Sequence, residues 1–222
     1  GKEDAYLKRP KVEVLAKAIA RMGLGQEVVA MQSNLISVEA IHAVAECDVV
    51  FGCTDGAEGR HWLNRIATFY SLPYFDVGIR LDADGNGGID CIAGAVHYLQ
   101  PGLSSLLSRG TYSMNRVEAE EIRRTNPEEY RRRVKEGYLR GIEEDRPAVI
   151  SVNMLFASMV VNEFLARIHE YRNERSCEYA SVMANLSEVC FLREPEVGEC
   201  PTLRKHVGRG DVAPLLDRPT LS

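Results

Sequence analysis

The segment from Val49 to Ile79 constrains the fold more than any other part of the chain. It opens with a short apolar run, residues 48–53, of the kind found in parallel strands that are covered on both faces. Small residues follow, and then Trp62, Ile66 and Phe69 recur at helical spacing. A second apolar run at residues 73–79 predicts another strand. Strand, helix and strand at such short spacing predict a parallel β–α–β unit.

Other segments extend this pattern on both sides. Helical spacing predicts a helix from Lys11, preceded by Pro10. Ser37 can cap a second helix that runs through Ala45, and a short strand is predicted between the two helices at residues 26–32. Asn126 followed by Pro127 is a helix start. Residues 151–169 are apolar around most of a helix, and the last fifty residues predict one or two strands followed by a tail.

The predicted fold class is therefore α/β. We expect a Rossmann-like, mostly parallel sheet flanked by helices, with an added antiparallel hairpin region. Residues 1–222 are predicted to form a single domain, in which residues 195–222 are an extended C-terminal tail.

Composition excludes several classes of protein. With 27 basic and 32 acidic residues, the net charge of −5 gives no electrostatic reason to expect nucleic-acid binding. No apolar run reaches the roughly 18 residues of a membrane span, and the first ten residues are too polar for a signal peptide. The six cysteines are scattered, several of them in apolar runs, which is typical of reduced thiols in a cytoplasmic protein.

Residues 82–93 invite a calcium-site interpretation. Asp82, Asp84, Asn86 and Asp90 match the start of a calcium loop, but Ala93 stands where a bidentate Glu is required. Asp-Gly and Asn-Gly pairs are also the preferred residues of tight hairpins. A hairpin is therefore the favoured interpretation.

Asp55 is the most informative polar residue. With Glu58 three residues later it matches a helix cap. It also stands just past the carboxyl end of the first predicted strand, where open α/β sheets bind ligands. Its position alone favours neither role, and both can hold together because a cap uses only part of a carboxylate's acceptor capacity.

Several segments together resemble the ThiF-type adenylyltransferases, which are relatives of ubiquitin-activating enzymes. The resemblance covers residues 1–102, resumes at residues 137–168 and returns at residues 207–222. Its most specific part is the pattern Cys53-Thr54-Asp55 followed by Arg60, with Lys11 upstream. In combination, this order and spacing are more specific than either piece alone.

The resemblance implies ATP-dependent adenylation of the C-terminal carboxylate of a ubiquitin-like or sulfur-carrier protein. Lys11 matches the family's lysine that faces the phosphates, and Asp55 matches its carboxylate that associates with Mg²⁺ and ATP. These two residues are the catalytic candidates, and we expect them to face one ligand pocket. A lysine is unfavourable at a helix start, which favours a binding role for Lys11. The full nucleotide-binding set by resemblance is Lys11, Asn34, Leu35, Thr54, Asp55 and Arg60.

The chain also departs from the family. The glycine-rich phosphate loop, the ribose-binding acid and the Asn-Arg pair would precede Gly1, so we expect little ATP–pyrophosphate exchange by this chain alone. Where relatives carry two CxxC zinc pairs, this chain has Ser105-x-x-Ser108 and Cys200-x-x-Leu203, so no zinc is predicted. Gly56 stands where many relatives have Asn.

Two other functions stay open. The chain could be a non-catalytic ThiF-like module that binds a ubiquitin-like protein or a full-length partner. A nicotinamide-dependent oxidoreductase ranks below both because no G-x-G-x-x-G loop is present. A glycine loop encoded upstream of Gly1 would favour the adenylating enzyme.

The helix predicted at residues 151–169 bears on assembly. It is apolar over more of its surface than a surface helix needs, which predicts a two-fold homodimer with this helix at or beside the interface. The alternative is that a charged helix near residues 116–136 covers the excess.

Overall fold

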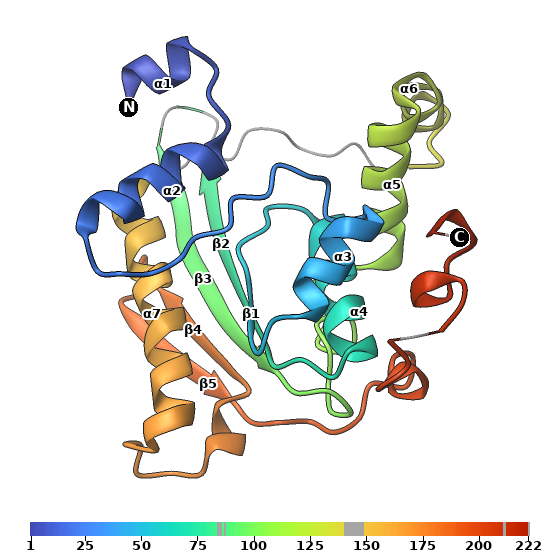
Figure 1. The fold of residues 1–222 in the computed structure, drawn as a ribbon. Coiled ribbons are helices and arrows are strands. Elements are labelled where there is room, and N and C mark those ends of the chain that lie inside the picture. Colours follow the sequence, from blue (N-terminus) through green and yellow to red (C-terminus); the bar gives the residue numbers. More distant parts are fainter. Residues whose placement is uncertain (84–85, 87, 140–148, 211, 222) are drawn as a thin grey trace. The chain divides into compact units, whose positions relative to one another are not determined.

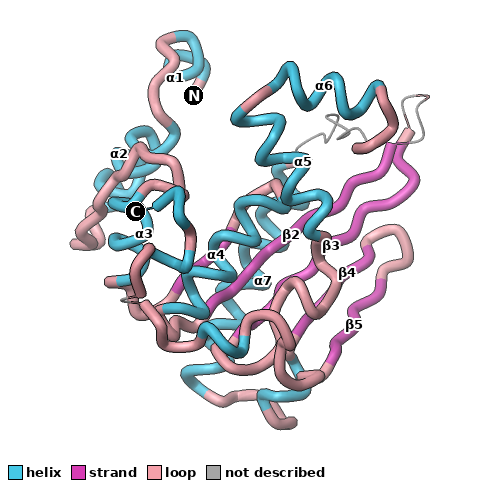
Figure 2. Tube along the Cα trace, turned by 90° about the vertical axis from the view of Figure 1, so that its right-hand side faces the viewer, coloured by secondary structure: helices cyan, strands magenta, loops and turns pink. Residues whose placement is uncertain are grey.

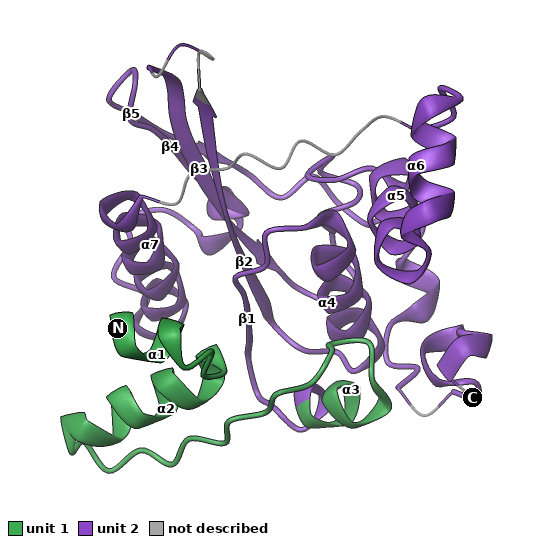
Figure 3. Cartoon of the chain, turned by 90° about the horizontal axis from the view of Figure 1, so that it is seen from above, with its two compact units in different colours: residues 1–43 green, residues 44–222 purple. Residues whose placement is uncertain are grey.

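The computed structural model describes residues 1–83, 86, 88–139, 149–210 and 212–221 (Figure 1). The chain divides into two compact units, one of residues 1–43 and one of residues 44–222 (Figure 3). α3 (Val38–Ala45) begins in the first unit and ends in the second.

The first unit is helical. It contains α1 (Lys2–Tyr6), α2 (Lys11–Met22) and the start of α3. Pro10 precedes α2, and Gly23 ends it in the left-handed conformation that glycine adopts most easily. The Oγ of Ser37 accepts a hydrogen bond from the N–H of Ala40 at 3.2 Å. Both predicted helices, and the Ser37 cap, are therefore confirmed.

The strand predicted at residues 26–32 is wrong. These residues have no regular secondary structure, and all of them are exposed. A strand is stable only when a neighbour pairs with its N–H and C=O groups, and within the described chain the sheet contains only the strands of the second unit. Residues with a β-forming composition therefore form an irregular segment.

The second unit is built on a five-stranded sheet, as far as the described residues show, in the order β1-β2-β3-β4-β5. Figure 2 shows β2, β3, β4 and β5 of this sheet. The strands are β1 (Val50–Gly52), β2 (Tyr74–Ala83), β3 (Ile89–Leu99), β4 (Ser181–Asn185) and β5 (Cys190–Glu194). β1 and β2 are parallel and are joined by α4 (Ala57–Phe69), which confirms the predicted β–α–β unit.

The other strand pairs are antiparallel. The α/β class and the hairpin region are thus confirmed, but among the strands with described placement one pair is parallel and three pairs are antiparallel, so this sheet is not mostly parallel. β2 and β3, and β4 and β5, follow each other directly in the chain and pair as hairpins, whereas the segment between β3 and β4 contains helices and returns β4 antiparallel to β3. β2 and β3 pair on both sides of the predicted turn, of which Asp84, Gly85 and Gly87 lie outside the described residues.

Helices cover opposite faces of this sheet (Figure 1). α7 (Ile150–His169) packs on β2 and β3, where Phe75, Val96 and Val160 form one core cluster. Phe156 of α7 belongs to a second cluster on the same face. α4 lies against β1 and β2 on the other face. β2 therefore has an apolar side under α7, and its alternate residues face α4.

The remaining elements surround α4 and the end of the sheet. α5 (Met114–Thr125) packs on α4, and α6 (Pro127–Lys135) follows after Asn126, whose side chain accepts the N–H of Glu129 at 3.1 Å, as predicted for a helix start. Short 3-10 turns complete the chain: η1 (Ser176–Tyr179), η2 (Arg204–His206), η3 (Leu215–Asp217) and η4 (Pro219–Leu221). None of the helices within the described ranges combines the length and apolarity of a membrane span.

Candidate functional site

The loop of residues 53–56 connects the carboxyl end of β1 to the start of α4. Asp55 is exposed in this loop, and Thr54 is half-buried. Because β1 runs parallel to β2, Asp55 stands at the sheet edge where α/β proteins bind ligands. The structure therefore places Asp55 where the sequence analysis predicted it, just past the carboxyl end of the first strand.

The cap of α4 differs from the prediction. The N-cap residue is Gly56, not Asp55, and the N–H of Glu58 donates to the Oε2 of Glu120 at 2.9 Å. The carboxylate of Glu58, which the predicted cap would have turned back to Asp55, instead pairs with Arg124 at 2.7 Å. The prediction of a D-x-x-E cap is wrong because α5 supplies the partners of both Glu58 groups: Glu120 for its N–H and Arg124 for its carboxylate.

Arg60 reaches from α4 to the sheet. Its Nε lies 3.2 Å from the Oδ2 of Asp76, whose side chain is fully buried. The hydroxyl of Tyr74 donates to the Oδ1 of Asp76 at 2.8 Å. Burial raises the pKa of Asp76, and the Arg60 charge and the Tyr74 hydrogen bond offset part of that shift. A Cβ at Gly78 would lie 2.3 Å from the Nη2 of Arg60, so any side chain at this position would require the Arg60 guanidinium to shift.

The side chain of Thr54, in the same loop, packs against the start of α4. A Cβ at Gly59 would lie 3.0 Å from the Cβ of Thr54, so α4 packs closely on this side chain. The Oγ1 of Thr54 is buried, and it has no hydrogen-bond partner within the part of the chain that the structure describes. Thr54 and Asp55 thus lie in the loop between β1 and α4, and Arg60 follows in α4, where its side chain pairs with Asp76 of β2.

The other candidate residues belong to the first unit. Lys11 is the exposed first residue of α2. Asn34 begins a turn: its Oδ1 accepts the N–H of Ile36 at 3.1 Å, and its carbonyl accepts the N–H of Ser37 at 2.9 Å. Leu35 is half-buried in this turn. Asn34 and Leu35, which the resemblance places in the nucleotide-binding set, therefore lie in a turn just before α3.

Two residues of this region were missed. Asp76 was detectable, because an acidic residue inside the apolar run of residues 73–79 requires a buried partner. Glu120 had no such signal, since it acts 62 residues away from the N–H that it accepts.

The ThiF family model matches residues 2–201 of the chain. The chain belongs to the ThiF family. The family inferred from the Cys53-Thr54-Asp55 pattern is thereby confirmed. Among curated proteins, none matches the chain.

The fold is similar to solved structures of MccB. The Microcin C7 biosynthetic enzyme MccB in complex with N-formylated MccA has a TM-score of 0.60 and 15% identity, over 89% of this chain and 52% of that chain. E. coli MccB with ATP has a TM-score of 0.56 and 15% identity, over 88% and 50%. E. coli MccB with AMPCPP and MccA has a TM-score of 0.57 and 15% identity, over 87% and 50%. The chain therefore spans about half the length of these structures, with which it shares its fold.

The segments that align by resemblance with the zinc pairs of ThiF relatives do meet in space. The Oγ of Ser105 donates to the Sγ of buried Cys200 at 3.0 Å. The hydroxyl of Ser108 donates to the carbonyl of Ser105 at 3.1 Å, and Leu203 is buried nearby in sequence. Among the residues with described placement, no three His, Cys, Asp or Glu side chains are grouped to hold a metal ion. The zinc prediction itself stays a prediction.

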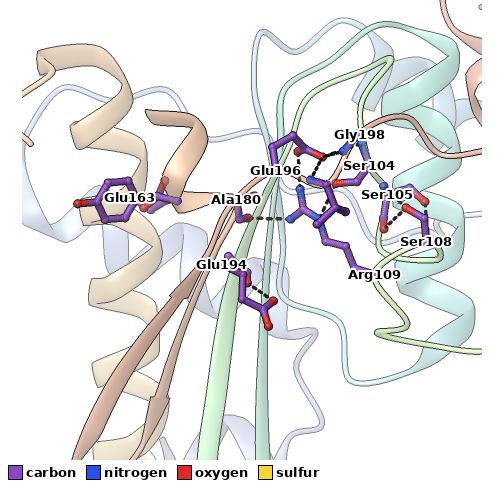
Figure 4. A network of polar contacts seen from close by, with 12 residues as sticks. Ser104, Ser105, Ser108, Arg109, Glu163, Ala180, Glu194, Glu196 and Gly198 are labelled. Atoms are coloured by element: carbon purple, nitrogen blue, oxygen red, sulfur yellow. Dashed lines mark hydrogen bonds and ion pairs between the residues drawn. The ribbon is translucent and has the colours of Figure 1, made fainter. Parts of the chain in front are cut away.

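A charged network lies beside these serines (Figure 4). The buried guanidinium of Arg109 donates to the Oγ of Ser104 at 2.8 Å, to the carbonyl of Ala180 at 2.7 Å and to the Oε2 of Glu196 at 3.0 Å. The Oε1 of Glu196 accepts the N–H groups of Ser104 and Gly198 at 3.1 and 3.2 Å. This network joins the segment after β3 to the segment after β5.

Proposed function

We propose that this chain contributes the Asp55 side of a ThiF-type adenylation site, which activates the C-terminal carboxylate of a ubiquitin-like or sulfur-carrier protein with ATP. The observation that carries the proposal is the place of Asp55: it follows the carboxyl end of a parallel strand and precedes α4 in a chain of the ThiF family.

The chemistry transfers AMP. An oxygen of the carrier's carboxylate attacks the α-phosphorus of ATP, the bond from that phosphorus to the bridging oxygen breaks, and pyrophosphate leaves. The products are an acyl-adenylate and pyrophosphate. Little covalent work falls to the protein, so positioning and charge stabilisation supply the rate enhancement.

The candidate residues fit these tasks. Mg²⁺ bound with ATP supplies charge neutralisation at the phosphates, and it is commonly held by one or two carboxylates together with phosphate oxygens and water. The exposed carboxylate of Asp55 fits that donor set. By resemblance, Lys11 contacts the phosphates, Asn34 and Leu35 border the adenine, and Thr54 and Arg60 belong to the nucleotide-binding set. E. coli MccB, a structural relative, was solved with ATP, which supports the choice of nucleotide.

We also propose a cytoplasmic homodimer. Cys53 and Cys91, which lie in apolar runs, are free thiols, which supports a reducing compartment. Several apolar residues of α7 are exposed, among them Ile150 at 80%, Met154 at 62% and Ile168 at 56%. An exposed apolar stripe of this kind is typical of a partner surface.

ATP–pyrophosphate exchange by the full-length protein tests the adenylation. Asp55→Ala is expected to lower the exchange rate by about 100-fold or more, because a charged group at the phosphates is removed. Asp48→Ala is the matched control: Asp48 is also exposed, but it precedes β1 and lies at the opposite end of the strand. Equal rates for Asp55→Ala and the parent protein would refute the role of Asp55.

The alternative is a non-catalytic module that binds a ubiquitin-like protein or a full-length ThiF partner. The same experiment separates the two functions. Binding of such a partner without any exchange, by the parent protein and by Asp55→Ala alike, would favour the module.

A further inference from the structure

The first turn of α4 receives its cap from α5. The N–H groups at the start of a helix have no acceptor inside the helix, and the acceptor usually comes from the side chain just before the first turn. Here that residue is Gly56, which has no side chain. The Oε2 of Glu120 accepts the N–H of Glu58 instead, at 2.9 Å.

Glu120 is itself held in place. Its side chain is 14% exposed, and its Oε1 accepts the Nε of Arg116 at 3.1 Å from the preceding turn of α5. One turn later, Arg124 donates to both carboxylate oxygens of Glu58, at distances of 2.7 to 3.2 Å. Residues 120 and 124 lie on the same face of α5. α5 therefore binds the start of α4 through two contacts: Glu120 accepts the backbone N–H of Glu58, and Arg124 pairs with the Glu58 carboxylate.

Gly56 leaves room for the Glu120 carboxylate at the start of α4. A Cβ at position 56 would lie 2.6 Å from the Oε2 of Glu120, which is closer than a real Cβ comes to a neighbouring atom. Any side chain at this position must therefore displace the Glu120 carboxylate. Gly56 directly follows Asp55. The Glu120 carboxylate therefore lies beside the last residue of the loop that carries Asp55.

We propose that Glu120 is a positioning residue of the candidate site: by capping α4 it holds the loop of residues 53–56, and through it Asp55. The inference rests on the proposed function for the role of Asp55. An uncapped helix end opens locally more often than a capped one. Opening the first turn of α4 would release the loop that is joined to it.

Amide hydrogen exchange and NMR shifts of this 222-residue chain test the cap. In Glu120→Ala, exchange at the Glu58 amide should become about fivefold to tenfold faster, as expected for the loss of a cap, and the signals of Thr54 and Asp55 should shift. Glu120→Gln keeps an acceptor oxygen and should restore both readouts. Glu118→Ala is the control, since Glu118 lies on the same helix but pairs with Arg133.

A second variant keeps Glu120 and blocks its place. Gly56→Ala should accelerate Glu58 exchange as Glu120→Ala does, and the double variant should add little, because both changes remove the same contact. The inference is overturned if Glu120→Ala leaves Glu58 exchange and the Thr54 and Asp55 signals unchanged.

Binding of Mg²⁺ and ATP by the full-length protein connects the cap to function. Glu120→Ala should weaken binding several-fold, and it should have no further effect in an Asp55→Ala background. Equal binding by Glu120→Ala and the parent protein would overturn the inference while leaving the proposed function intact. If the parent protein binds no nucleotide, the proposed function fails. The amide hydrogen exchange measurement still decides whether Glu120 holds the loop.

Discussion

Asp76 illustrates, at the scale of single residues, how a sheet can bury a charge. Its side chain is fully buried, yet one oxygen lies beside Arg60 and the other accepts the hydroxyl of Tyr74. A buried carboxylate is tolerated when a counter-charge and hydrogen bonds replace water. Since Arg60 belongs to α4, this pair also links α4 to β2.

Removal of this carboxylate should be costly. Asp76→Ala leaves the largely buried Arg60 without its counter-charge, so the free energy of unfolding is expected to fall by about 3 kcal/mol. Asp82→Ala, on the same strand, is the control: it breaks an exposed pair with Arg80, and such a pair contributes little to stability, so its loss should cost much less. Urea denaturation of both variants measures the difference, and similar losses would contradict the prediction.

His61 gives the stability a pH dependence. Its Nδ1 lies 3.0 Å from the hydroxyl of Tyr112, and burial, with smaller contributions from the Arg65 and Arg218 charges, lowers the pKa of His61 to about 4. Between the unfolded pKa of about 6.5 and this folded value, only the unfolded chain binds the proton. Stability should therefore be lost as the pH falls from about 6.5 to about 4, by an amount on the order of 3 kcal/mol.

His61→Gln isolates this contribution. Urea denaturation at several pH values should show a smaller decline for the variant than for the parent chain over that window, whatever the variant's stability at neutral pH. Parallel pH profiles would show that His61 does not titrate in this way.

At the scale of elements, Arg109 and Glu196 connect segments that are far apart in the sequence (Figure 4). Arg109 follows β3, Glu196 follows β5, and Arg109 also binds the carbonyl of Ala180 just before β4. Ser105 and Cys200 meet in the same region. Hydrogen bonds and one buried ion pair thus join the two segments.

Arg109→Ala should weaken this connection strongly. The variant leaves Glu196 partly buried without its counter-charge, so we expect a loss of about 3 kcal/mol in the free energy of unfolding. Arg204→Ala, also near the end of this region, removes an exposed pair with Glu199 and should cost about 0.5 kcal/mol or less. Equal thermal shifts for the two variants would refute a structural role for the buried pair.

At the scale of the whole molecule, α7 carries two apolar surfaces. Val152, Phe156 and Val160 face the sheet and are buried. Exposed apolar residues recur three, four or seven positions apart along another side: Ile150, Met154, Val161, Leu165 and Ile168. Packing on the sheet therefore uses one face of α7, and the second face is available for a partner subunit.

The dimer prediction can be tested by placing one charged side chain on the exposed apolar face of α7. The parent chain should sediment as a dimer at micromolar concentration, and Val161→Glu should convert it to a monomer near 24.7 kDa, because a buried charge at the interface is unfavourable. Asn153→Glu, an exposed change to one side of the stripe, should remain dimeric. A parent chain that sediments as a clean monomer would defeat the prediction.

The sequence by itself determined the features that depend on neighbouring residues. Apolar periodicity located α2 and α4, the Ser37 cap located α3, and a long apolar segment located α7. Asn126 and Pro127 marked the start of α6, and the spacing from Cys53 to Arg60, with Lys11 upstream, identified the ThiF family. It also placed Asp55 past the carboxyl end of β1. For each helix and for Asp55, the signal and the structure that it specifies lie within a few turns of chain.

Only the tertiary structure decided which distant groups meet. Residues 26–32 have the composition of a strand but no partner in the described sheet. Asp55 and Glu58 have the spacing of a cap, yet Gly56 leaves room for Glu120, whose carboxylate takes the N–H of Glu58. β3, β4 and β5 join the parallel pair in the antiparallel direction. Strand pairing and capping both need an acceptor or donor that can come from anywhere in the chain, and local sequence does not specify which residue the fold brings there.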